Sequence, residues 1–212
     1  VLPNTALDSH EIDANYFQHV PYLEDFNDKN KTNIVSVATV HFEPFGIYAG
    51  KTASLDDLKA SIKAGESVTI SVPNDTTNEA RALLLLQQEG IITLPKDADL
   101  AVTVADIQAI NGIPEGVTIK ELDAAQIAQS LQDVNVACIN GNYAVQAGLD
   151  VDSSLAVEAA DGIAATTYAN VIACNDGDQD SDKIKALAKA VNDPEVRDYI
   201  TKTYGNAVVP VF

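Results

Sequence analysis

The chain has 212 residues, of which 46% are hydrophobic and 21% are charged, so it can bury one large core or two modest ones. This composition excludes a disordered tail and a disulfide-stapled miniprotein. Its 31 acidic residues outnumber 13 Lys and Arg, leaving a formal net charge of -18 that repels phosphate backbones and anionic lipid headgroups. We therefore expect no nucleic-acid partner and no membrane contact through a charged surface.

Apolar runs typical of buried strands alternate with helical patterns along the chain. Strands are predicted at 33–40, 68–72, 118–121, 134–139 and 170–174. Helices are predicted at 55–64, 79–89, 100–109, 124–132, 141–147, 183–191 and 194–204. This alternation indicates the α/β class with largely parallel sheets. The longest uninterrupted apolar run, 82–86, is far shorter than the ~20 residues of a transmembrane helix.

The clearest local motif is a strand, a polar turn and a helix over 68–86. Thr76 and Glu79 have the spacing of a capping box, which predicts a helix N-terminus whose unpaired N–H groups attract anions. Arg81 follows early in this helix, and its planar guanidinium suits a carboxylate. From the residues alone, an ordinary solvated surface arginine is an equally good interpretation.

A second candidate site lies in 15–22, where aromatic residues alternate with polar ones. Tyr16, Phe17, His19 and Tyr22 suit a pocket wall, with rings against an apolar ligand group and polar atoms at its other end. The alternative is an aromatic-rich helix that packs on its own sheet.

Two asparagines interrupt the ends of apolar strands. Asn140 follows the run 136–139, and Asn170 precedes the run 171–173. Each side chain must find a partner, either in the local backbone of a turn or on a ligand, and the sequence leaves both possibilities open.

Motifs for metal binding and catalysis are weak or missing. His41 and Glu43 share one face of an extended strand, but no His-x-x-x-His or Cys-x-x-Cys pattern accompanies them. The acidic segment 175–182 lacks the Gly and Glu positions of a calcium loop. The sequence also lacks a nucleophile elbow, a phosphate-binding loop and a dinucleotide fingerprint. We expect no metal, no cofactor and no enzymatic activity, and we interpret Cys138 and Cys174 as buried hydrophobes.

The sequence as a whole resembles the methionine-binding lipoproteins of the NlpA type, which are substrate-binding proteins of methionine ABC importers. The resemblance spans essentially the entire chain and rests on the segments 2–7, 13–19, 42–48, 73–86, 139–144 and 168–172. It implies a two-lobed α/β clamp of the periplasmic-binding-protein type 2, with the ligand held between the lobes and no catalysis.

The resemblance also implies roles for the candidate residues. Arg81 would bind the ligand carboxylate, Asn140 and Asn170 the amino-acid head group, and Phe17 and His19 the side-chain pocket, with Tyr16 and Tyr22 as weaker candidates. The implied ligand is L-methionine, D-methionine or a methionine-containing peptide. The implied partners are the permease and ATPase of an ABC importer.

We expect lobe one to comprise residues 1–46 and 171–212, and lobe two residues 47–170. Family members carry a strand, a helix and a strand before the equivalent of residue 1, behind a lipidated cysteine, so we expect an incomplete first lobe. The implied location is extracytoplasmic, with a lipid anchor outside this sequence. The alternatives are an adhesion or signalling lipoprotein that keeps the clamp fold without transport and, third, a metal-binding importer protein.

Overall fold

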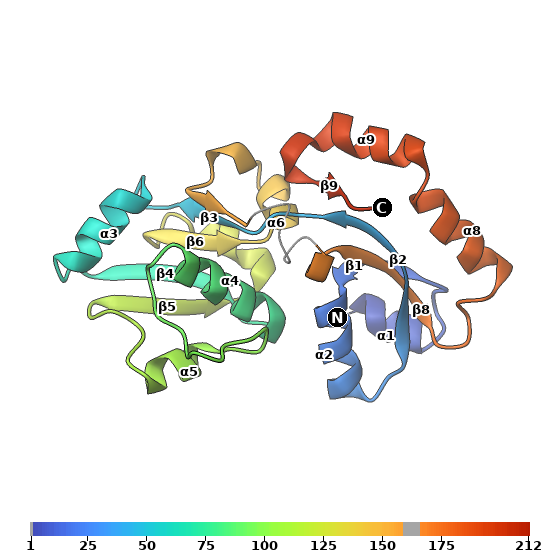
Figure 1. Cartoon of the computed structure of the whole chain (residues 1–212), viewed down its shortest axis with the longest axis horizontal. Coiled ribbons are helices and arrows are strands. Elements are labelled where there is room, and N and C mark those ends of the chain that lie inside the picture. Colours follow the sequence, from blue (N-terminus) through green and yellow to red (C-terminus); the bar gives the residue numbers. More distant parts are fainter. Residues whose placement is uncertain (1, 159–165) are drawn as a thin grey trace. The chain divides into compact units, whose positions relative to one another are not determined.

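The computed structural model describes residues 2–158 and 166–212, and the chain divides into two compact units (Figure 1). Unit 1 comprises Val1–Glu43 and Ala159–Phe212, and unit 2 comprises Pro44–Glu158. The expected lobes had their boundaries after residues 46 and 170. The segment just before 170 lies in unit 1 because Tyr168 packs with Phe42 there.

Unit 1 is built on a four-stranded sheet with the order β1-β8-β2-β9. These strands span Asn15–His19 (β1), Asn170–Asn175 (β8), Ile34–Phe42 (β2) and Val209–Pro210 (β9). Every pairing within this sheet is antiparallel among the residues that the structure describes, so the expectation of largely parallel sheets is wrong for unit 1.

The reason lies in the position of β8. The crossover through helix α2 (Val20–Asn30) carries the chain from β1 to β2. Both strands are antiparallel to β8, which lies between them, so they run in the same direction without pairing. Local alternation of strand and helix cannot reveal that a strand from more than a hundred residues later is inserted between them.

Helices cover both faces of this sheet. On one face, residues of α1 (Leu2–Asp8) and α2 pack on Ile34 and Ala173. On the other face, Ile172, the neighbour of Ala173, packs with Ile200 of α9 (Pro194–Tyr204), and α8 (Asp182–Val191) adds Leu187. The side chains of successive strand residues point to opposite faces, which explains why almost all of β8 is buried.

Unit 2 contains a five-stranded sheet with the order β5-β4-β6-β3-β7. The strands are Val117–Leu122 (β5), Val68–Pro73 (β4), Val136–Ile139 (β6), Gly46–Ala49 (β3) and Ala156–Val157 (β7). Strand β4 is parallel to β5 and β6, as predicted, whereas β3 is antiparallel to β6 and β7.

The core of unit 2 is again divided by its sheet. The larger apolar cluster joins the sheet to α3 (Leu55–Lys63), α4 (Thr76–Gln88) and α5 (Val104–Ala109). The smaller cluster joins it to the 3-10 helix η1 (Ala124–Ser130) and to α6 (Gly141–Gln146). Short 3-10 turns also occur at Val151–Ser153 (η2) and, in unit 1, at Gly205–Ala207 (η3).

Two predicted helices differ from the expectation, one in its length and one in its length and helix type. The helix predicted at 100–109 begins only at Val104, because Thr103 and Asp106 form a capping box there. The helix predicted at 124–132 is a 3-10 helix that ends at Ser130. Among the described residues, every helix is too short or too polar to cross a bilayer.

Cys138 of β6 and Cys174 of β8 are both buried free thiols, in agreement with their interpretation as small hydrophobes. Burial raises the pKa of the Cys138 thiol. Burial, followed by the charges of Asp178 and Asp176, also raises the pKa of Cys174.

Candidate functional site

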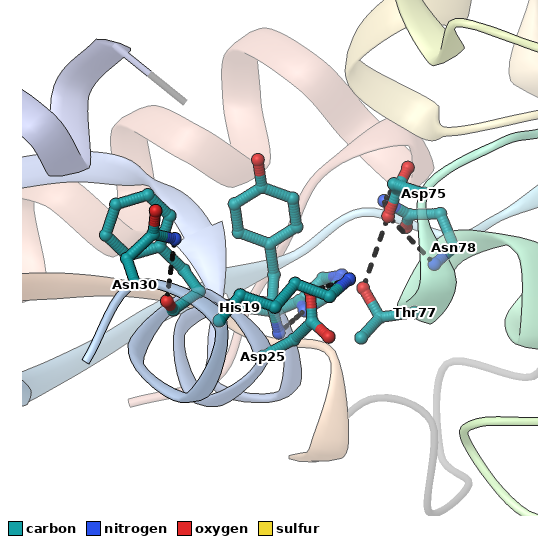
Figure 2. Close-up of polar contacts among 9 residues, drawn as sticks. His19, Asp25, Asn30, Asp75, Thr77 and Asn78 are labelled. Atoms are coloured by element: carbon teal, nitrogen blue, oxygen red, sulfur yellow. Dashed lines mark hydrogen bonds and ion pairs between the residues drawn. The ribbon is translucent and has the colours of Figure 1, made fainter. Parts of the chain in front are cut away.

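The helix α4 begins one residue earlier than the proposed capping box requires. Asp75 is the N-cap, and its carboxylate accepts the backbone N–H of Asn78 at 3.1 Å and the Asn78 side-chain amide at 2.9 Å (Figure 2). Thr76 is therefore the first helical residue, and the predicted Thr76–Glu79 box is wrong. A carboxylate is a stronger acceptor than a hydroxyl, which accounts for the choice of Asp75.

The side chain of Glu79 is hydrogen-bonded to the start of α5 and does not cap the N-terminus of α4. Its Oε1 accepts the backbone N–H of Val104 at 2.8 Å, at the start of α5. Burial raises the pKa of Glu79, and this hydrogen bond acts in the opposite direction. The carboxylate thus ties two helices together in the interior of unit 2.

Arg81 lies in the interior of unit 2, with a side chain that is only 4% exposed. Its Nε donates to both carboxylate oxygens of Glu158 at 2.9 Å, and Nη2 donates to Oε2 at 2.6 Å. Its guanidinium also lies over the ring of Phe45, 5.0 Å from the ring centroid. The interpretation as a solvated surface arginine is therefore wrong.

Glu158 is held from two sides. Besides Arg81, the backbone N–H of Phe45 donates to Oε2 at 3.2 Å, and the Glu158 backbone N–H donates to the carbonyl of Phe45 at 2.9 Å. Phe45 follows the point where the chain enters unit 2, and Glu158 is the last residue before it leaves. Both crossing segments are thus linked to Arg81.

Asn140 is connected to the same helix. It occupies the N-cap position of α6 without capping it, and its Nδ2 donates to Oδ1 of Asn78 at 2.8 Å. Asn78 lies three residues before Arg81 in α4, so the two side chains share a helix face. Within the part of the chain that the structure describes, the buried Oδ1 of Asn140 lacks a hydrogen-bond partner. An unsatisfied buried acceptor of this kind suits the N–H of a ligand.

In unit 1, the aromatic segment predicted as a pocket wall is an edge strand followed by a helix. His19 ends β1 and caps α2, because its Nδ1 accepts the backbone N–H of Tyr22 at 3.2 Å (Figure 2). The His19 ring contacts Tyr168 and Tyr22 edge-on, with centroids 5.2 and 6.2 Å away, and Phe17 contacts Tyr22 at 5.9 Å. Phe17 is 37% exposed, so one part of this cluster is accessible.

Asn170 lies beside that cluster. It is the first residue of β8, and its register partners are His19 on β1 and His41 on β2. On the neighbouring strands, the hydroxyl of Tyr16 is hydrogen-bonded to Nδ1 of His41, whose Nε2 contacts Oε1 of Glu43 at 3.0 Å. All five candidates of this segment and strand thus belong to unit 1, with Phe17, His19 and Tyr22 in one ring cluster and Tyr16 on His41, whereas Arg81 and Asn140 belong to unit 2.

The side chains of His41 and Glu43 are in contact, as expected for one side of an extended segment, although β2 ends at Phe42 and Glu43 follows it. A metal site would need at least one more ligand. In residues 2–158 and 166–212, no group of three or more His, Cys, Asp or Glu side chains is arranged to hold an ion.

Sequence reasoning missed four residues that contact the candidates: Glu158, Asn78, Phe45 and Tyr168. Asn78 could have been found, because a helix through 76–88 places it on the face of Arg81. Glu158 could not, because a single acidic residue after a short apolar pair carries no pattern. Its role depends on a partner 77 positions away.

The whole chain, residues 1–212, matches the family model of the NlpA lipoproteins. The methionine-binding lipoprotein MetQ of Bacillus subtilis is 35% identical over 98% of this chain and 73% of its own length. A lipoprotein structure from Ruminococcus gnavus is 49% identical, with a TM-score of 0.93 over 100% of this chain and 84% of that one. A nutrient-binding protein from Burkholderia cenocepacia, solved with bound methionine, is 39% identical, with a TM-score of 0.89 over 100% and 84% of the two chains.

These relatives agree with the α/β architecture of two sheets and with the family that the sequence resembles. The Bacillus subtilis relative is a methionine-binding lipoprotein and the Burkholderia cenocepacia relative is a nutrient-binding protein, which confirms the prediction that this chain is not an enzyme. On the full-length match and the fold, the chain belongs to the NlpA lipoprotein family.

Proposed function

We propose that this protein binds methionine outside the cytoplasm and delivers it to the permease and ATPase of an ABC importer. Family membership supports this function, as do the methionine-binding relative and the methionine-bound relative. The same membership supports an extracytoplasmic, lipid-anchored location, because relatives across the family are lipoproteins.

The observation that carries the proposal is the buried polar set of unit 2. Arg81 provides a guanidinium for a carboxylate, and the orphaned Oδ1 of Asn140 provides an acceptor for an ammonium group. Asn78 links the helix of Arg81 to Asn140. A cation and an acceptor in one buried set match the two charged groups of an amino acid.

Unit 1 supplies the groups for the side chain. We propose that Phe17 and His19 contact the thioether, with Tyr16 and Tyr22 as further contacts and Asn170 on the head group. Aromatic rings suit sulfur because a polarisable thioether interacts favourably with their edges. The partial exposure of Phe17 leaves its ring accessible to a ligand.

A thermal-shift panel tests the proposal. Ligand-free protein is prepared by unfolding, dialysis and refolding, and is then melted with each of the twenty amino acids, with D-methionine and with methionine dipeptides. A ligand at 100 times its dissociation constant adds about 2.7 kcal/mol of stability. A shift confined to one form of methionine supports the proposal and identifies the substrate. A melting temperature that is the same with every ligand contradicts the proposed function and favours an adhesion or signalling role.

A further inference from the structure

Arg81 and Glu158 form an ion pair in the interior of unit 2. The arginine that we assign to the ligand carboxylate already binds a carboxylate of its own chain, through Nε and Nη2. Glu158 therefore either competes with the ligand or prepares Arg81 for it.

The surroundings of Glu158 argue against competition. Its side chain is 10% exposed, it also accepts the N–H of Phe45, and its own backbone N–H donates to the Phe45 carbonyl. Displacement by a ligand would leave a buried carboxylate without its cation, which is strongly unfavourable. The pair is thus part of the folded scaffold.

A fixed Glu158 has two consequences for Arg81. The guanidinium is planar, so binding it through Nε and Nη2, with Phe45 against one face, fixes its orientation. The glutamate charge also offsets the arginine charge, so the Arg81–Glu158 pair itself is close to neutral. A neutral pair attracts a simple anion less than an isolated guanidinium does, and it does not repel the ammonium group of a zwitterion.

We propose that Glu158 is a positioning residue that orients Arg81 and makes the site select zwitterionic amino acids over carboxylates without an ammonium group. This inference rests on the proposed function, because it assumes that Arg81 receives the ligand carboxylate. It adds a specificity determinant outside the predicted contact residues.

The test compares methionine with 4-(methylthio)butanoate, which keeps the carboxylate and thioether but lacks the ammonium group. Dissociation constants are measured by calorimetry for the wild type, Glu158→Gln and Glu158→Asp. Glu158→Gln keeps an oxygen acceptor for Arg81 and removes the charge. Glu158→Asp keeps the charge and shortens the side chain. Circular dichroism and melting curves verify that each variant folds.

We expect Glu158→Gln to lower the preference for methionine over the analogue by about tenfold or more, the smaller end of measured effects for close charge pairs. We expect Glu158→Asp to weaken the binding of both ligands by a similar factor and to retain the preference for methionine over the analogue. A merely structural role would change both affinities by one common factor in Glu158→Gln, and this outcome overturns the inference while methionine binding by the wild type stands. If the wild type does not bind methionine, the proposed function fails and the inference fails with it.

Discussion

Asn140 donates its side-chain amide to Oδ1 of Asn78 at 2.8 Å, although 62 positions separate the two residues. The bond connects the end of β6 to the first turn of α4, the helix that carries Arg81. It makes Asn140 part of a polar set that the fold assembles from two βα connections of unit 2.

Replacement of Asn140 by alanine is expected to weaken methionine binding by about 1 to 3 kcal/mol, the usual effect of losing a buried hydrogen-bond partner. The variant loses the orphaned acceptor and also the amide that orients Asn78. Titration calorimetry gives the affinity, and urea denaturation gives the stability.

Asn135→Ala is a matched control, because Asn135 bonds the backbone N–H of Thr69 and the hydroxyl of Thr52 in the same unit. It is expected to lower stability by a similar amount and to leave the affinity unchanged. Equal affinities for the wild type and Asn140→Ala would remove Asn140 from the proposed site.

Arg81→Lys keeps the positive charge but loses the planar pair of donors, so methionine binding is expected to weaken by about 2 to 5 kcal/mol. Lysine retains a cation beside Glu158, which limits the loss of stability. Arg81→Ala leaves Glu158 buried without a cation and is expected to destabilise unit 2 by about 3 to 5 kcal/mol.

Calorimetry and chemical denaturation separate the two effects for Arg81. Arg197→Ala is the control for loss of an arginine, because Arg197 lies over the ring of Phe212 in unit 1. An Arg81→Lys variant that binds methionine as tightly as the wild type would contradict the carboxylate assignment.

The pKa of Glu79 predicts a pH-dependent stability. Burial raises this pKa above its ordinary value of 4.5, so the folded state holds the proton more tightly than the unfolded state. The stability contributed by the protonated carboxyl is fully present at pH values below 4.5, and it is lost as the pH rises through the folded-state pKa. The ionised form is the one that burial disfavours.

Glu79→Gln removes this titration and keeps an oxygen to accept the Val104 N–H. The free energy of unfolding of Glu79→Gln minus that of the wild type is therefore expected to increase from about pH 4 to about pH 7. Urea denaturation at both values measures the difference, with the exposed Glu66→Gln as control. A difference that is constant with pH would contradict the prediction.

The two cysteines are expected to be unreactive in the folded protein. Both are buried and both have raised pKa values, so little nucleophilic thiolate forms. Ellman's reagent should detect no thiol in the native protein at about pH 8 and both thiols in urea. A rapidly reacting native thiol would contradict the structure, and fewer than two thiols in urea without reductant would indicate a disulfide.

Local patterns located the strands β2, β4, β5, β6 and β8 and the helices α3, α4, α5, α6, α8 and α9, but they assigned no strand or helix to α1, β1, α2, β3, β7 or β9. The strand at 68–72 and the helices at 55–64 and 194–204 agree with β4, α3 and α9 to within a residue. The predictions failed where two local acceptors compete, as at Asp75 and Thr76, or where an apolar segment folds as a 3-10 turn, as in η1. Hydrophobic periodicity does not distinguish these cases, because each buries similar side chains.

The sequence by itself determined the α/β class, the family, and an arginine near a helix N-terminus as the best candidate for a carboxylate ligand. Periodicity, capping residues and ordered motifs each depend only on residues that are close together in the sequence. Only the tertiary structure decided that β8 lies between β1 and β2, that Asn78 binds Asn140, and that Glu158 binds Arg81. These relationships join residues far apart in the chain. They arise because buried strands and buried charges need partners, and the choice of partner depends on which segments the fold brings together.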